Sequence, residues 1–135
     1  MRARRRLLAI VGWAFVIAAA CGRSAPPAPD ARPLEIVVTN DDGIEAPGIA
    51  ALAEALRPLG TVTVAAPDGN RSGASHGVTS DRPIVVRESV REGLRWYAID
   101  ALPATCIRLA VEELLEARPD IVVSGINRGE NLGTV

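Results

Sequence analysis

Short runs of apolar and β-branched residues alternate along the chain with polar segments and with segments of helical periodicity. The run at 34–39 is typical of a buried strand, and the runs at 61–66 and 121–123 predict two further strands. Two more runs, at 84–88 and 94–99, lie on either side of an Arg-Glu-Gly turn and predict a hairpin.

Two segments between these strands carry apolar residues at helical spacing. From Ile49 they repeat at i, i+3, i+4 and i+7, with Pro47 near the helix start and Pro58 at its end. A second repeat follows Pro103, and Pro119 is expected to end that helix. The order strand, helix, strand, then helix, strand predicts an α/β fold with a mostly parallel sheet and helices on both faces.

The first 33 residues have a different composition from the rest. Residues 1–20 predict a secretory signal, because arginines precede an apolar run that is shorter than the roughly 20 residues of a membrane span. Small residues before Cys21 make this segment resemble a bacterial lipoprotein signal with Cys21 lipidated. Residues 21–33, rich in proline and alanine, predict a tether, and 34–135 the folded domain. We expect an exported protein, periplasmic or anchored in a membrane as a lipoprotein. A plain cleaved signal and an uncleaved anchor are the alternatives.

The bulk composition narrows the choice of partners. With 135 residues, 48% of them hydrophobic, the chain has room for one domain at most. A formal net charge of -1 gives no basic face for a nucleic-acid duplex, so no such partner is expected. The second cysteine, Cys106, lies among helical apolar residues, where a small buried side chain is expected.

Each of three predicted strands is followed at once by polar residues. These clusters are 40–42, 68–72 and 124–131. In open parallel sheets the carboxyl ends of the strands form the ligand-binding edge. Three clusters in equivalent positions therefore predict a binding site there.

Asp41 and Asp42 are adjacent carboxylates that would repel each other unless a cation lay between them. Ser72 and Asn127, in the other two clusters, could add further oxygen ligands. An all-oxygen set suits Mg²⁺ or Mn²⁺ better than zinc. The alternative is that the two aspartates belong only to a turn with a helix cap.

The third cluster is rich in glycine, which lets backbone N–H groups approach a phosphate closely. It lacks the Gly-Lys-Ser/Thr of a Walker A loop. His76 is the only histidine, and without a Gly-x-Ser-x-Gly turn a Ser-His-Asp hydrolase is not indicated. His76 is expected at the surface, with contact to a substrate phosphate as the alternative.

Three spaced motifs together resemble the SurE family of metal-dependent nucleotidases. They are Thr39–Gly43 with Ala46–Gly48, Ala66–Asp68 leading to Arg71–Gly73, and Ser124–Gly133. The resemblance implies a Rossmann-like three-layer α/β/α fold and the hydrolysis of nucleoside monophosphates to nucleoside and phosphate, the reaction of a 5′-nucleotidase. It also implies that intact members form homo-oligomers.

The resemblance assigns roles to individual residues. The metal ligands it implies are Asp41, Asp42, Ser72 and Asn127. Asn40 joins the two aspartates as a supporting residue of the catalytic motif. The candidates for contact with the substrate phosphate are Gly129 and Asn131, which lie in the third motif, and His76, which lies outside the three motifs.

The sequence departs from the family in three ways. Residues 100–106 replace the family's Asp-Gly-Thr-Pro-Ala-Asp-Cys segment with Asp-Ala-Leu-Pro-Ala-Thr-Cys, which puts the substrate preference in doubt. Family members usually lack an export signal. They also continue beyond the position of Val135 for roughly the same length again. We therefore expect an N-terminal portion of the domain, truncated at the C-terminus, with its last strand at a sheet edge.

Two other functions are possible on the sequence alone. A haloacid-dehalogenase-like phosphatase also places aspartates after its first strand, but it needs them two residues apart, and Asp41 and Asp42 are adjacent. The second is an inactive fragment, or a lipid-anchored module that binds a metal or nucleotide without turnover.

Overall fold

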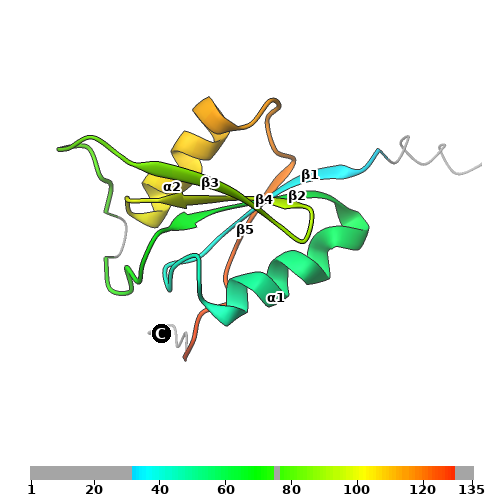
Figure 1. Cartoon of the computed structure of the whole chain (residues 1–135), viewed down its shortest axis with the longest axis horizontal. Helices are drawn as coiled ribbons and strands as arrows, with labels where there is room; N and C mark the ends of the chain where they lie inside the picture. Colours follow the sequence, from blue (N-terminus) through cyan, green and yellow to red (C-terminus); the bar gives the residue numbers. More distant parts are fainter. Residues whose placement is uncertain (1–31, 75–76, 130–135) are drawn as a thin grey trace, which may run out of the picture. The chain divides into compact units, whose positions relative to one another are not determined.

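The computed structural model describes residues 32–74 and 77–129, which form a five-stranded sheet with a helix on each face (Figure 1). The elements in chain order are β1 (Leu34–Thr39), α1 (Pro47–Leu56), η1 (Arg57–Leu59), β2 (Gly60–Pro67), β3 (Val86–Arg91), β4 (Leu94–Ile99), α2 (Pro103–Leu109), η2 (Ala110–Leu114) and β5 (Ile121–Ser124). No helix within these ranges is long and apolar enough to cross a membrane.

The strand order is β3-β4-β2-β1-β5. β1 pairs in parallel with β2 and β5, β2 pairs in parallel with β4, and only β3 is antiparallel. This arrangement confirms the expected α/β fold with a mostly parallel sheet. Within the described part of the chain β5 lies at a sheet edge, also as expected.

The apolar run of β1 supplies both faces of the sheet, because successive side chains of a strand point in opposite directions. Ile36 and Val38 pack in one cluster with Ile49 and Ala53 of α1. Val37, between them, packs in a second cluster on the side of α2. A continuous apolar strand is therefore what a sheet covered on both faces requires.

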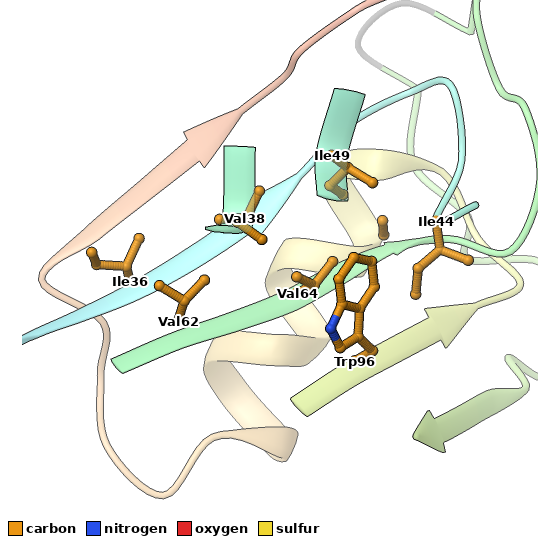
Figure 2. Packing of buried hydrophobic residues seen from close by; sticks show 9 residues of the cluster. Ile36, Val38, Ile44, Ile49, Val62, Val64 and Trp96 are labelled. Atoms are coloured by element: carbon orange, nitrogen blue, oxygen red, sulfur yellow. The ribbon is translucent and has the colours of Figure 1, made fainter. Parts of the chain in front are cut away.

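The cluster beneath α1 is the larger of the two, and Figure 2 shows its labelled side chains gathered on one face of the strands. Its buried members are Ile36, Val38, Ile44, Ile49, Ala53, Val62, Val64, Ala66 and Trp96. The cluster on the other face consists of Val37, Ala65, Tyr97, Ile99, Ala101, Cys106 and Ala110. The two clusters hold the α1 and α2 layers on opposite faces of the sheet.

The second helix ends earlier than its sequence predicts. The expected end was Pro119, but η2 stops at Leu114, where the Leu115 N–H donates to the Ala110 carbonyl at 3.0 Å. Leu115 is already extended. The chain needs the following residues to return to the sheet, where the Asp120 N–H donates to the Glu35 carbonyl at 2.8 Å.

The hairpin is confirmed, with β3 two residues later than predicted. Its turn consists of Glu92 and Gly93, with φ of 51° and 83°. Two successive positive φ values match the twist of the flanking strands, which favours this two-residue turn. Ile84, expected in the strand, packs against the second cluster.

A bidentate ion pair joins the start of β1 to the start of β5. The Arg32 guanidinium donates to the Asp120 carboxylate at 2.6 and 2.9 Å, and the Glu35 N–H donates to the same carboxylate at 2.9 Å. The hydrogen bond from Arg32 is the main cause of a lowered pKa of Asp120, and the bond from the Glu35 N–H adds to it. Asp120 therefore helps to fix the register of the edge strand.

Truncation of Ile49, which packs α1 on the sheet, should destabilise the fold. Ile49 is 0% exposed, so Ile49→Ala should lower the free energy of unfolding by about 2–5 kcal/mol. Leu59→Ala, at a side chain 56% exposed, is the control and should cost much less. Urea unfolding measures both, and equal losses would contradict the packing described.

The Asp120 ion pair should make the stability of the fold depend on pH in the acidic range. Because the pKa of Asp120 is lower in the folded state, its contribution is present above its unfolded pKa of about 4 and is lost as pH falls through the folded pKa. The difference in unfolding midpoint between the wild type and Asp120→Asn should therefore shrink on acidification below about pH 4. A difference in unfolding midpoint that stays constant down to pH 2 would contradict this role of the Asp120 ion pair.

Candidate functional site

Three loops leave the carboxyl ends of adjacent parallel strands and meet at one edge of the sheet. Loop 1 (residues 40–46) follows β1, loop 2 (68–74) follows β2, and loop 3 (125–129) follows β5. Since β2, β1 and β5 are neighbours, the polar clusters predicted from the sequence come together. This is the edge at which open α/β sheets bind ligands.

Asn40 shapes loop 1 from inside. Its side chain is 0% exposed, donates to the Gly43 carbonyl at 3.1 Å and accepts from the Gly43 N–H at 3.2 Å. The next residue, Ile44, donates its N–H to the Pro67 carbonyl at 2.8 Å. Asn40 is thus a brace for the turn that carries the two aspartates, which suits the supporting role expected for it.

The Asp42 carboxylate links all three loops. One oxygen, Oδ1, accepts a hydrogen bond from the Ser72 hydroxyl at 3.3 Å. The other, Oδ2, accepts one from the Arg128 backbone N–H at 2.6 Å. Two predicted ligand residues, Asp42 and Ser72, are therefore in contact across 30 positions of sequence.

Asp41 is held through its backbone. Its carbonyl accepts from the Arg71 N–H at 2.7 Å, which joins loop 1 to loop 2. The Gly125 N–H donates to the Thr39 carbonyl at 2.9 Å and joins loop 3 to the end of β1. Asp41 and Asp42 are both partly buried residues.

Two glycines let the loops approach this closely. Gly43 has φ of +99°, and a Cβ there would lie 2.8 Å from the Gly69 carbonyl carbon. At Gly48, in the first turn of α1, a Cβ would overlap the Ile126 carbonyl oxygen. The first glycine allows loop 2 to pack on loop 1, and the second allows α1 to pack on loop 3.

The donor set fits a hard divalent cation. The two adjacent carboxylates, with the Ser72 hydroxyl in contact with one of them, offer oxygen atoms alone. Across the described residues, no three His, Cys, Asp or Glu side chains are grouped as a metal-binding set. Mg²⁺ is commonly held by one or two carboxylates with water completing its shell, and this site matches that pattern.

The other predicted residues are only partly placed. Asn127 lies in loop 3, directly before Arg128, whose N–H binds Asp42. Gly129, the next residue after Arg128, is exposed and has φ of +132°. The remaining predicted residues, Cys21, His76 and Asn131, lie outside the described residues.

Cys106 is not part of the site. It is 0% exposed, and its thiol lies 3.6 Å from the Ala101 carbonyl. Burial raises the pKa of Cys106 to about 12. The thiol therefore stays protonated at neutral pH, in keeping with its expected role as a small buried side chain.

Sequence reasoning missed an ion-pair network that joins loop 2 to the residue after β4 and to two further arginines. The Arg71 guanidinium binds Asp68 at 3.1 Å and Asp100 at 3.0 Å, while Arg87 binds Asp68 and Arg82 binds Asp100. Arg82 is the first cause of the lowered pKa of Asp100. A signal was present, since Asp68 and Asp100 each directly follow a strand, but their pairing depends on the strand order.

The sequence model of a family described as Survival protein SurE matches residues 36–135, which include all three loops. The chain belongs to the SurE family. Among its relatives, the 5′-nucleotidase SurE of Pelobacter propionicus is 54% identical over 100 residues, which are 74% of this chain and 39% of that protein. The 5′-nucleotidase SurE of Porphyromonas gingivalis is 50% identical over 105 residues, 76% of this chain and 41% of that protein.

The SurE fold is confirmed by a solved structure. The crystal structure of the SurE protein from Aquifex aeolicus matches with a TM-score of 0.63 and 44% sequence identity, over 73% of this chain and 39% of that one. The chain thus spans about two fifths of the length of the SurE proteins it matches.

Gly43→Ala should disturb the site as well as the fold. The added methyl meets the backbone of loop 2, and a positive φ strains any L side chain. We expect a loss of stability of about 1–3 kcal/mol. Gly93→Ala is a matched control, because its φ is +83° with nothing within 4 Å. Thermal unfolding should show the larger loss for Gly43→Ala; equal losses would mean that loop contact adds nothing to backbone strain.

Proposed function

We propose that this chain carries the metal-binding portion of a phosphate-monoester hydrolase that converts nucleoside 5′-monophosphates to nucleoside and phosphate. The observation that carries the proposal is the Asp42 carboxylate, which accepts hydrogen bonds from Ser72 and Arg128 beside Asp41. The printed names of the SurE relatives, 5′-nucleotidases, support the choice of substrate.

Four side chains would hold the cation, which is Mg²⁺ or Mn²⁺. They are Asp41, Asp42, Ser72 and Asn127. When bound, such a cation polarises phosphoryl oxygens and lowers the pKa of a coordinated water, which provides a nucleophile at neutral pH. The chain's own part is to orient these ligands, and the Arg128 N–H does so by fixing one oxygen of Asp42 at 2.6 Å.

Loop 3 is suited to the phosphate itself. Its backbone at Gly129 is exposed and free of a side chain, so a phosphate oxygen can approach the main chain. We assign Gly129 and Asn131 to phosphate contact on the strength of the family motif, and His76 as the single histidine of the sequence. These contacts would orient the substrate, whereas the metal ligands would act on its charge.

The location and assembly of the protein are further parts of the proposal. The arginine-rich start, the apolar run and Cys21 support export with a lipid on Cys21, which would place the domain at a membrane surface. Homo-oligomers are proposed from the family resemblance. Mass spectrometry of the mature N-terminus would test the lipid.

The nucleotidase proposal predicts metal-dependent phosphate release by the full chain. With Mn²⁺ present, release from nucleoside 5′-monophosphates should exceed the metal-free rate, and Asp41→Asn with Asp42→Asn should return it to that rate. The amide keeps the size of the carboxylate but removes the charge that binds the cation.

The control is Asp81→Asn, the same chemical change at an exposed aspartate outside the three loops. It should leave phosphate release unchanged. Release that persists in the double variant would show that the two aspartates do not bind a catalytic metal.

A further inference from the structure

Arg71 makes four hydrogen bonds, two through its backbone and two through its side chain. It directly precedes Ser72, which is a proposed metal ligand. Its N–H donates to the Asp41 carbonyl at 2.7 Å, and its own carbonyl accepts from the Ala74 N–H at 3.1 Å. Its side-chain nitrogen Nη2 donates to Asp68 at 3.1 Å and to Asp100 at 3.0 Å. One residue thus joins loop 1, loop 2 and the ends of two strands.

The two carboxylates that hold Arg71 are themselves fixed by the sheet. Asp68 directly follows β2, and its N–H donates to the Ile99 carbonyl at 2.9 Å. Asp100 directly follows β4, and its N–H donates to the Val85 carbonyl at 2.9 Å. The guanidinium is therefore bound to two carboxylates at strand ends, whereas the backbone of Arg71 lies within loop 2.

Arg71 shares each of its two carboxylates with another arginine, and it is less exposed than Arg87. Its side chain is 34% exposed, against 62% for Arg87, which also binds Asp68. Screening by water weakens exposed pairs, so the less exposed guanidinium contributes more. Among the described residues the Nε of Arg71 has no hydrogen-bond partner, so the side chain is held through Nη2.

We propose that Arg71 is a positioning residue for the metal site. Held by Asp68 and Asp100, it fixes the backbone on which Ser72 is carried, and through its N–H it fixes the carbonyl of Asp41. The inference rests on the proposed function, since it concerns the same cation. Arg71 itself touches neither metal nor substrate.

The first test is Arg71→Met, which keeps much of the side-chain bulk but removes the charge and the donors. Groups behind metal ligands typically change affinity by about 10–100-fold, so the Kd for Mn²⁺, measured calorimetrically without substrate, should rise by that factor. Arg71→Lys should recover most of the affinity, because a single nitrogen makes both of the bonds. Arg87→Met is the matched control and should bind Mn²⁺ as the wild type does.

Hydrogen exchange gives a second readout that does not depend on metal. In the metal-free full chain, the amides at positions 71 and 74 should exchange faster in Arg71→Met than in the wild type or in Arg87→Met, because both amides are bonded within this arrangement. Amides of β1 should be unchanged, which separates a local effect from a general loss of stability.

Each outcome decides between the two proposals. Unchanged Mn²⁺ affinity and unchanged exchange in Arg71→Met would overturn the positioning role and leave the nucleotidase proposal standing. No Mn²⁺ binding by the wild type would overturn the metal site, and the exchange rates would still decide whether Arg71 orders the loops. If Arg71→Met fails to fold, Asp100→Asn takes its place: faster exchange at position 71 then supports the role, and unchanged exchange contradicts it.

Discussion

The site depends on a carboxylate that is held from two sides. Asp42 accepts from the Ser72 hydroxyl with one oxygen and from the Arg128 N–H with the other, so loops that follow three different strands share one side chain. A negative charge placed beside Asp41 is unfavourable unless donors or a cation compensate it. Two donors already do so in part, and the remaining lone pairs of two adjacent carboxylates are what a divalent cation would use. The hydrogen bonds that shape the loops and the proposed binding of a cation would therefore meet the same electrostatic requirement.

That requirement can be met only because the sheet is parallel at this point. β2, β1 and β5 end at the same edge, and the buried run of β1 sets the position of the other two by its register. Packing on both faces fixes the strand against slippage, since a shift of one residue would turn Ile36 and Val38 toward the wrong helix. The hydrophobic core thus determines where β1 ends and the two aspartates begin. A few hydrogen bonds between the loops then suffice to orient them.

The sequence predicts the local elements well because their signals are local. The apolar run of β1, the spacing after Ile49 and the proline at position 47 each specify an element through its own residues. The strand-end rule predicts that the clusters containing Asp42 and Ser72 meet, but no local rule says which of their side chains bind each other. The Arg71 network was out of reach, because its partners meet only once β4 is known to lie beside β2.

The segment at 100–106, which departs from the family motif, includes the start of α2 and is bonded to Thr79. The helix begins after Leu102, which offers no side-chain cap, yet the Leu102 N–H is bound by the Thr79 hydroxyl at 3.1 Å. The Thr79 N–H in turn donates to the Thr105 hydroxyl at 2.9 Å. An orphan N–H at a helix start needs such an acceptor, and here a residue beyond loop 2 supplies it. The chain is thereby anchored at Arg71 and again at Thr79, where two hydrogen bonds hold residue 79 to the start of α2.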